Sequence, residues 1–352
     1  MKREEKHDLL KYVGDLYSLF GMKQYTLADG RARGMRAIDL KNGKGIEMTV
    51  LPDRAMDIPY LSFHGISMHF TSKTGLVSPE YYVEDGARGF LKNFDAGLLT
   101  TCGITYSGAA CEYKGRKLGL HGPLPNTPAE NVNKWVDYEK DDVVLKLSGT
   151  MREACVFEEN MQLHREMTLL TERNMLRIHD TVENCGFEEQ PVMLVYHINF
   201  GYPMLDPCCR VYFNTTDVSP RTDYAKTGLD KYDVMEEPVV GQDEMCFIHT
   251  ASGVKNRFAM LHNPKLGYAA VVHYDGDQCS SLCEWKCMRA GEYVLGLEPN
   301  TSMLQTRENG EKDGNLIKLK GGETYDVDVW VEFLDDQAEI QNYIDRSTNV
   351  GR

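Results

Sequence analysis

Short segments in which polar and apolar residues alternate fill most of this chain, and they limit its possible folds more than any other feature. From about residue 24 onward, these segments follow one another with turn-forming glycine and asparagine residues between them. Alternation at every second position is typical of a β-strand that buries one face. Many short strands in succession predict a large antiparallel β-sandwich, so we expect an all-β fold.

The segment NMLRIHDTV (174–182) shows the alternation clearly. Arg177, His179 and Thr181 share one face of such a strand, while the other face is apolar except for Asp180. Comparable segments are GIEMTVL (45–51), VVLKLSGTM (143–151), LHREMTLL (163–170), YAAVVHY (268–274) and YDVDVWVEF (325–333). No repeat period or linker separates them, so they predict one continuous domain over residues 24–352.

Three segments have helical patterns instead. Apolar residues at helical spacing over residues 3–20 predict an amphipathic helix, which would pack on the β body as a lid or form a dimer contact. Shorter helices are expected around residues 79–86 and in DDQAEIQNYID (335–345). The expected organisation is an N-terminal helix within residues 1–23 followed by the β-sandwich domain. A homodimer is compatible with this arrangement.

The acidic balance of the chain restricts its partners. Its 39 Lys and Arg are outnumbered by 53 Asp and Glu, which gives a formal net charge of −14. Nucleic acids and anionic membranes both bind basic surfaces, so we expect neither as a partner. No apolar run reaches the roughly 18 residues of a membrane span. The N-terminus also lacks the apolar core of a secretory signal, and we therefore expect a cytoplasmic protein.

The ten cysteines are scattered along the chain. Without an export signal, reduced thiols are expected rather than a disulfide framework. Neither the adjacent Cys208 and Cys209 nor the pair Cys283 and Cys287 has the spacing of a metal knuckle, so we interpret them as buried or incidental thiols. Phosphate-loop and dinucleotide-binding motifs are absent from the sequence. We expect neither a metal nor an organic cofactor.

The stretch YHINFGYPMLD (196–206) places polar side chains at the end of an apolar strand. His197 and Asn199 are two residues apart and therefore share one face of the strand. The strand pattern breaks at Gly201 and Pro203. The two residues either form a hydrogen-bonded pair in the core or lie on the floor of a binding site.

Two other motifs place a titratable side chain in an apolar context. His121 lies between glycines in GLHGPLPN (119–126), where glycine allows a ligand to approach the backbone; the alternative is a turn whose imidazole bonds its own backbone. Glu298 ends the apolar strand YVLGLEPN (293–300). A carboxylate there is costly to bury without partners, so it either caps a neighbouring loop or is a base with a shifted pKa.

Taken in order, these motifs resemble the aldose 1-epimerase (galactose mutarotase-like) superfamily, and most closely a branch whose substrate is undefined. The resemblance extends from about residue 30 to the C-terminus. It implies a large β-sandwich that binds a free sugar on one face. Besides the motifs above, it rests on LPDRAMDI (51–58), FDAGLLTTCGI (94–104) and EWKCM (284–288).

The resemblance also implies roles for three residues. His197 would be the general acid, Glu298 the general base, and His121 would bind the sugar near the reacting carbon. A protonated His197 beside an ionised Glu298 fits these roles. The implied activity is interconversion of the anomers of a monosaccharide, an isomerase reaction that needs no cofactor. The alternatives are a non-catalytic carbohydrate-binding protein and another sugar isomerase or lyase with the same acid and base.

The family pattern leaves the sugar-binding arginine open. Mutarotases carry an arginine upstream of the histidine–glycine motif, and Arg54 is the first candidate here, with Arg88 as the alternative. Arg54 would form a fork onto sugar hydroxyls or hold Glu298. A surface ion pair with Asp53 or Asp57 is the other interpretation of Arg54.

Other candidates for contact with the sugar lie later in the chain. The resemblance implies a sugar-binding aspartate shortly before a phenylalanine, and Asp243 and Glu244 in QDEMCF (242–247) are the candidates for it. Lys286 would either meet an anionic sugar or cover Trp285. Asn199 would orient the imidazole beside it or bind a sugar hydroxyl.

Overall fold

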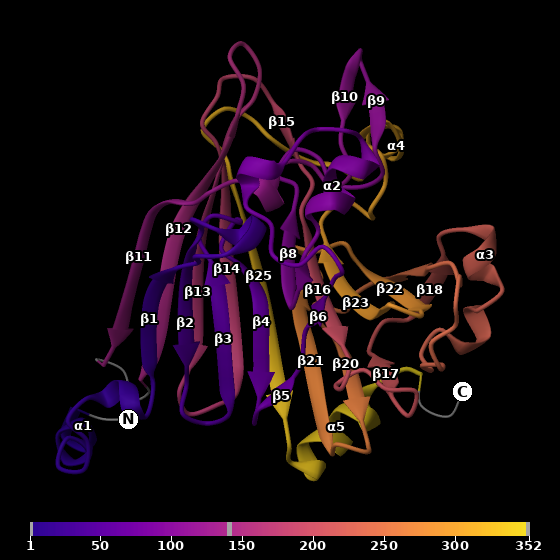
Figure 1. Cartoon of the computed structure of the whole chain (residues 1–352). Coiled ribbons are helices and arrows are strands. Elements are labelled where there is room, and N and C mark those ends of the chain that lie inside the picture. The colour runs from indigo at the N-terminus through magenta and orange to yellow at the C-terminus, as the bar shows by residue number, and fades with distance from the viewer. Residues whose placement is uncertain (1–2, 139–142, 350–352) are drawn as a thin grey trace.

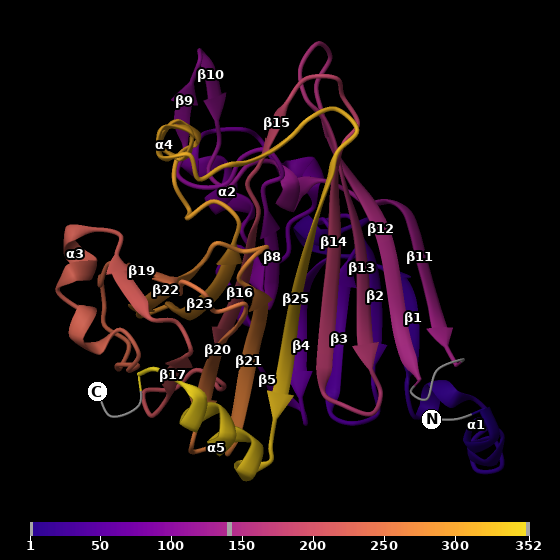
Figure 2. The same cartoon turned by 180° about the vertical axis from the view of Figure 1, so that it is seen from behind.

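Two large antiparallel sheets face each other in the computed structural model, which describes residues 3–138 and 143–349 (Figures 1 and 2). The first sheet has eleven strands, and β5 (Ile66–Ser67) pairs only with β4. Its other strands, in spatial order, are β1 (Gly21–Thr26), β2 (Arg36–Lys41), β3 (Ile46–Leu51), β4 (Asp57–Phe63), β8 (Leu99–Cys102), β16 (Val195–Gly201), β23 (Glu292–Asn300), β22 (Ser281–Arg289), β19 (Met245–Thr250) and β18 (Asp217–Pro220).

The second sheet has eight strands. In spatial order they are β11 (Glu130–Asp137), β12 (Val144–Ala154), β13 (Asn160–Leu170), β14 (Met175–Asn184), β25 (Thr324–Leu334), β21 (Tyr268–Asp275), β20 (Asn256–Asn263) and β17 (Arg210–Phe213). Three small sheets pair β6 (Phe70–Thr71) with β7 (Ala96–Gly97), β9 (Cys111–Tyr113) with β10 (Arg116–Leu118), and β15 (Gln190–Val192) with β24 (Ile317–Leu319). The predicted all-β sandwich is therefore confirmed.

The main core lies between the two large sheets. Leu40 and Val50 from the first sheet and Leu147 and Ile178 from the second belong to one cluster of buried side chains. Burial of apolar surface of this kind is the dominant favourable contribution to folding. The alternation in the sequence follows directly from it, because each strand turns one face toward this core.

Asp180, which interrupts the apolar face of its segment, is buried in this core. Arg165 donates to it through Nε at 2.8 Å and Nη2 at 2.6 Å, and the Tyr196 hydroxyl donates at 2.7 Å. A buried carboxylate is tolerated when it is paired and hydrogen-bonded in this way. Because Tyr196 directly precedes His197, the network also fixes β16, one of the strands that carry the candidate site.

The helix predicted over residues 3–20 is wrong in its extent. Helix α1 covers Arg3–Leu9 only, and Gly14 and Asp15 then interrupt the helical pattern. Asp15 instead caps the short 3-10 turn η1 (Leu16–Ser18) through a bond from the Tyr17 backbone at 2.9 Å. An aspartate favours such a cap because its side chain competes for backbone donors. In Figure 1, α1 lies outside the sandwich at its edge beside β1.

The other helices are short. The segment predicted around residues 79–86 contains the 3-10 turn η3 (Pro79–Tyr81), and helix α2 (Ala87–Asn93) begins just after it. The C-terminal prediction is confirmed by α5 (Gln337–Arg346), which Asp336 caps. The remaining helices are α3 (Asp223–Lys226) and α4 (Arg307–Asp313). No helix of residues 3–138 and 143–349 is both long and apolar enough to cross a membrane.

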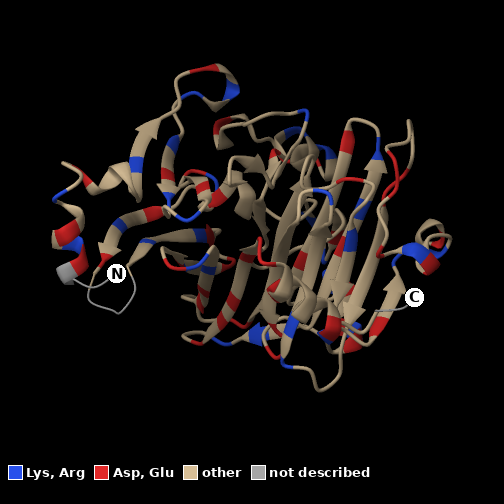
Figure 3. Cartoon of the chain, turned by 90° about the horizontal axis from the view of Figure 1, so that it is seen from below, with Lys and Arg blue, Asp and Glu red and all other residues tan. Residues whose placement is uncertain are grey.

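Charged residues of both signs are interspersed along the strands and loops (Figure 3). All ten cysteines are free thiols. Cys209, Cys283 and Cys287 are buried, whereas Cys208 is exposed.

Candidate active site

The fold brings His121, His197 and Glu298 together. The register between β16 and β23 aligns Val195 with Asn300 and Asn199 with Gly296, so His197 lies opposite Glu298. The His197 Nε2 atom is 3.2 Å from Glu298 Oε1, and both side chains are almost fully buried. The ring of His121 meets the His197 ring edge-on, with 5.9 Å between the centroids. We call His197 and Glu298 the acid–base pair, and the face of the eleven-stranded sheet that carries them the site face.

Asn199 fixes the orientation of His197. The His197 Nδ1 atom is 2.5 Å from Asn199 Oδ1, and Asn199 Nδ2 donates to the His197 backbone oxygen at 2.9 Å. An amide oxygen only accepts hydrogen bonds, so we assign the hydrogen of the imidazole to Nδ1. Nε2 then faces Glu298. Of the two roles predicted for Asn199, orientation of the imidazole is the one that this geometry favours.

Aromatic rings enclose the two histidines. The ring of Phe94 is 5.1 Å from that of His197, and Trp285 meets His197 edge-on at the same centroid distance. Phe90 lies 5.0 Å from His121. These rings belong to a second apolar cluster, separate from the main core, which lines the site face. A setting of this kind strengthens any electrostatic interaction inside it, because it lowers the local dielectric.

Burial shifts both groups of the acid–base pair toward their neutral forms. Loss of hydration lowers the pKa of His197 to about 4, although the hydrogen bond to Asn199 acts in the opposite direction. Loss of hydration also raises the pKa of Glu298 well above its usual value, and Cys246 adds to this effect. The structure therefore favours a neutral His197 beside a protonated Glu298, whereas the sequence-based expectation was the ion pair. The two arrangements differ only in the position of one proton.

The Glu298 carboxyl group does not cap a loop. Its Oε1 atom is buried and has no hydrogen-bond partner among the described residues, because the contact with His197 is short but poorly aligned. A buried polar atom without a partner costs about 1–3 kcal/mol. That cost is recovered if a ligand supplies the missing partner, and this favours the interpretation of Glu298 as a functional group.

His121 shows the same signs of a functional residue. Its backbone has φ of 59°, a left-handed conformation that costs an L-residue about 1–2 kcal/mol. Its Nδ1 atom is buried and lacks a hydrogen-bond partner in the described part of the chain, so the imidazole does not bond its own backbone. Burial lowers the pKa of His121 to about 3, and electrostatic repulsion from His197 makes a smaller contribution in the same direction. The ring is thus neutral and free to bind a hydroxyl group.

Gly296 makes room for the acid–base pair. A Cβ atom at Gly296 would lie 2.5 Å from Glu298 Oε1 and 3.1 Å from Trp285 Cβ. Side chains two apart on a strand share one face, so any other residue here would compete with Glu298 for space. This explains why a glycine stands two residues before the glutamate in the sequence.

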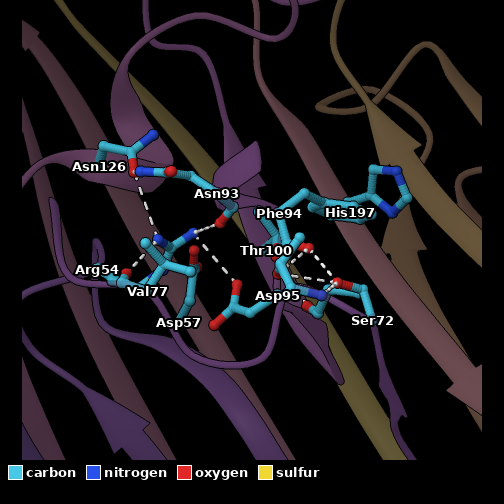
Figure 4. Close-up of polar contacts among 12 residues, drawn as sticks. Arg54, Asp57, Ser72, Val77, Asn93, Phe94, Asp95, Thr100, Asn126 and His197 are labelled. Carbon is cyan, nitrogen blue, oxygen red and sulfur yellow. Dashed lines mark hydrogen bonds and ion pairs between the residues drawn. The ribbon is translucent and has the colours of Figure 1, made fainter. Parts of the chain in front are cut away.

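Arg54 lies behind the site, where it holds the loop that carries Phe94 (Figure 4). Its Nη1 atom donates to the Val77 backbone oxygen at 2.8 Å, and Nη2 donates to that of Asn93 at 2.9 Å. Nη2 also lies 3.2 Å from Asp95 Oδ1. Arg54 is buried and does not form a surface ion pair. Contact with a sugar would require these bonds to break, so we assign Arg54 a positioning role.

The other candidate for the sugar-binding arginine is exposed. Arg88 lies in α2 and its side chain faces solvent. Neither Asp53 nor Asp57 is the ion-pair partner of Arg54. Asp53 pairs with Arg36 at 2.6 Å, and Asp57 accepts a bond from the Thr101 backbone at 2.9 Å.

The structure separates the two acidic candidates. Glu244 Oε2 accepts a hydrogen bond from Trp285 Nε1 at 2.7 Å, and Trp285 in turn contacts His197. Glu244 thus reaches the edge of the site through Trp285. Asp243 is exposed and precedes it in the loop before β19.

Lys286 faces away from the site, contrary to both of its predicted roles. It alternates with Trp285 along β22 and therefore points to the opposite face of the sheet. Its Nζ atom donates to the backbone oxygens of Lys231 at 3.0 Å and Val234 at 2.7 Å, and it lies 3.3 Å from Glu236. The strand pattern could have revealed that Lys286 and Trp285 lie on opposite faces, because they are adjacent in one strand.

Two residues near the acid–base pair were missed from the sequence. Arg221 follows the edge strand β18, and its backbone nitrogen donates at 2.9 Å to the backbone oxygen of Cys246, the second missed residue. Arg221 belongs to no motif, and Cys246 lies within QDEMCF (242–247), where only the two acidic residues were considered. Only the pairing of β18 with β19 brings Arg221 to this face of the sheet. Within the described ranges, no group of three or more His, Cys, Asp or Glu side chains could hold a metal ion.

Comparison with solved structures finds similar folds in sugar-related proteins. A candidate aldose 1-epimerase from Klebsiella pneumoniae is 25% identical with a TM-score of 0.86, over 96% of this chain and 88% of that chain. A galactose mutarotase-like protein from Clostridium acetobutylicum is 13% identical with a TM-score of 0.64, over 91% of this chain and 100% of that chain. A galactose 1-epimerase from Lactobacillus acidophilus is 13% identical with a TM-score of 0.61, over 90% of this chain and 99% of that chain.

These neighbours confirm the resemblance to the aldose 1-epimerase (galactose mutarotase-like) superfamily, and at 13% identity the likeness shows the fold alone. No match is found among curated proteins. Residues 32–333 match the model of a family described as "Domain of unknown function (DUF4432)". Because this match covers most of the sequence, the chain belongs to the DUF4432 family.

Proposed function

We propose that this protein is an aldose 1-epimerase that interconverts the anomers of a free monosaccharide. The observation that supports the proposal best is the buried acid–base pair, with His197 Nε2 3.2 Å from Glu298 Oε1. A protein that only binds a sugar has no need of both an acid and a base. Glu298 Oε1 and His121 Nδ1 have no hydrogen-bond partner among the described residues, and both side chains lie against His197. A bound sugar could supply their hydrogen bonds.

The reaction needs two proton transfers in each direction. The base removes the proton from the hydroxyl group on C1 while the acid protonates the ring oxygen, so the bond from C1 to the ring oxygen breaks and an aldehyde forms. Rotation about the C1–C2 bond turns the other face of the aldehyde toward the ring oxygen. The reverse transfers close the ring as the other anomer and restore both side chains.

The acid–base pair holds one proton in either of its arrangements. In the ion pair, His197 is the acid and Glu298 is the base, as the family resemblance implies. In the neutral pair, which burial favours, Glu298 holds the proton and His197 Nε2 accepts one. Each arrangement contains one acid and one base, and the two arrangements differ only in which of the residues holds the proton. The proposal therefore requires both residues, whichever of them holds the proton at rest.

The surrounding rings provide a surface for the substrate. A sugar ring has an apolar face of C–H groups, which packs favourably on aromatic side chains. Trp285 and Phe94 both contact His197 and would take this part of the sugar. His121 would bind the hydroxyl group on or next to C1.

Anomer exchange tests the proposal directly. Freshly dissolved aldoses would be followed by polarimetry or one-dimensional NMR with the wild type and with Glu298→Gln, in which the side chain neither takes nor gives a proton. We expect the wild type to accelerate exchange of at least one sugar and the substitution to lower that rate by ~10²–10⁴-fold. Glu292→Gln is the matched control, because Glu292 begins the same strand but pairs with Lys73 outside the site.

Two outcomes would contradict the proposal. Sugars that bind to the wild type without faster exchange would indicate a carbohydrate-binding protein. Solvent hydrogen that enters the sugar at C2 would indicate another isomerase or a lyase, because anomer exchange leaves every C–H bond intact.

A further inference from the structure

Arg221 lies on the site face, at the edge of the eleven-stranded sheet. Its backbone nitrogen donates to the Cys246 oxygen at 2.9 Å. This bond continues the pairing of β18 with β19, in which Pro220 is opposite Phe247, so Arg221 is opposite Cys246. Residues opposite each other on antiparallel strands have their side chains on the same face.

A row of paired residues leads from Arg221 to the acid–base pair. Cys246 is opposite Trp285, Trp285 is opposite Gly296, and Gly296 is opposite Asn199. The acid–base pair lies two residues further along the last two strands and hence on the same face. With strands about 4.8 Å apart, three strand spacings place the Arg221 backbone about 14 Å from the strand of Glu298, a gap that an arginine side chain and one monosaccharide can span.

The charge of Arg221 acts on the site. It opposes the effect of burial on the pKa of Glu298 and contributes to the lowered pKa of His121. The side chain is exposed, and no carboxylate of a described residue forms an ion pair with it. Its charge also lowers the pKa of the Cys246 thiol. The guanidinium group is therefore available to a ligand.

Part of the lining around the acid–base pair is apolar. It includes aromatic, aliphatic and thiol side chains, namely Phe90, Phe94, Ile248, Cys283 and Leu304. A guanidinium group forms two parallel, charge-assisted hydrogen bonds to a carboxylate or phosphate, and these are about twice as strong as bonds between neutral groups. An anionic substituent is therefore a better match for Arg221 than a hydroxyl group.

Glu244 carries a carboxylate at the edge of the site, where it accepts the Trp285 hydrogen bond. Its charge raises the pKa of Cys246 and of Glu298, whereas the charge of Arg221 lowers both. The charge of Arg221 also acts on Tyr106 and His121. The net charge of −14 repels anions from a distance, but salt screens this repulsion beyond about 8 Å at physiological ionic strength. Close to Arg221, attraction prevails.

We propose that Arg221 determines the substrate class by binding an anionic group, a carboxylate or a phosphate, on the monosaccharide whose reducing carbon lies at the acid–base pair. The orientation of the sugar rests on the proposed function, whereas the preference for an anionic sugar does not. Equilibrium binding can therefore test Arg221 separately from catalysis.

The experiment measures the dissociation constants of glucose, glucuronate and glucose 6-phosphate, and of the same three forms of galactose, by NMR titration or calorimetry. We expect the wild type to bind an anionic form about 10- to 100-fold more tightly than its neutral parent. Whichever anionic form has the larger gain in affinity over its neutral parent identifies the group as a carboxylate or a phosphate. Arg221→Gln should bring the ratio of the two dissociation constants, neutral form over anionic form, close to one. Arg221→Lys should restore part of the preference for the anionic form.

Lys226→Gln is the matched control, since it removes a positive charge from α3 that pairs with Asp223 outside the site. It should leave the ratio unchanged. Equal binding of neutral and anionic sugars, no binding of any of them, or a preference that survives Arg221→Gln would overturn the assignment. Anomer exchange of neutral sugars would still support the proposed function in that case. Conversely, an Arg221-dependent preference without anomer exchange would reject the proposed function only.

Discussion

The low pKa of His197 makes its titration a test of the resting state of the acid–base pair. Because the folded chain holds this pKa near 4, below the usual 6.5, the unfolded chain binds the proton first as the pH falls. The neutral imidazole thus contributes stability that is complete above about pH 6.5 and is lost as the pH drops toward 4, by about 3 kcal/mol in all.

We expect ¹⁵N NMR to show a neutral His197 with its hydrogen on Nδ1 from pH 5 to pH 8. The free energy of unfolding of His197→Gln, measured in urea, should fall less between pH 7 and pH 4.5 than that of the wild type. An imidazolium signal at pH 7 would show instead that the ion pair is the resting state.

Gly296 provides a second test at a single position. In Gly296→Ala the new methyl group would lie 2.5 Å from Glu298 Oε1, so the carboxyl group must move. We expect the rate of anomer exchange to fall by about 10- to 100-fold, since small misplacements of catalytic groups have effects of this size. Gly14→Ala is the control, because a Cβ atom there meets nothing within 4 Å. Unchanged exchange by Gly296→Ala would show that Glu298 tolerates displacement.

The loop between α2 and β7 depends on one buried ion pair. Arg54 bonds its backbone at Asn93 and pairs with Asp95, whose pKa is raised by burial and held down by Arg54. Arg54→Met would leave Asp95 buried without a counter-charge. We expect a loss of about 3–5 kcal/mol in the free energy of unfolding, measured in urea. Adding Asp95→Asn should recover part of the loss, and purely additive effects would argue against the ion pair.

At the level of strands, the sequence predicted which residues share a face but not which strands are neighbours. His197 and Asn199 were placed correctly because alternation is a local property of one strand. The pairing of β16 with β23, which makes His197 and Glu298 neighbours, joins segments about a hundred residues apart and leaves no local signal. Arg221 was missed for the same reason. For His121, the glycines beside it pointed to close approach of a ligand to the backbone, whereas nothing in the sequence pointed to the positive φ of His121 itself.

Helix boundaries were less predictable than strands. The apolar spacing over residues 3–20 continues through Gly14 and Asp15, so periodicity alone could not reveal where the helix ends. The end is decided by the competing cap that Asp15 forms.

For the molecule as a whole, the N-terminal segment should be dispensable for folding. No side chain from residue 5 to residue 19 is buried, and Phe20 is the first that belongs to the main core. A variant that begins at Asp15 should unfold in one cooperative transition, with a free energy within about 1 kcal/mol of the full chain. Light scattering after gel filtration would show whether residues 1–14 are needed for a dimer. A larger loss of stability would mean that α1 contributes to the core.

The position of β25 has a consequence for synthesis of the protein. It is the last strand in the sequence, yet it lies in the interior of the second sheet, between β14 and β21. Until β25 has left the ribosome, the strands on either side of this gap expose unpaired edges and apolar faces to solvent or to chaperones. Loss of β25 alone would therefore divide the sheet in two.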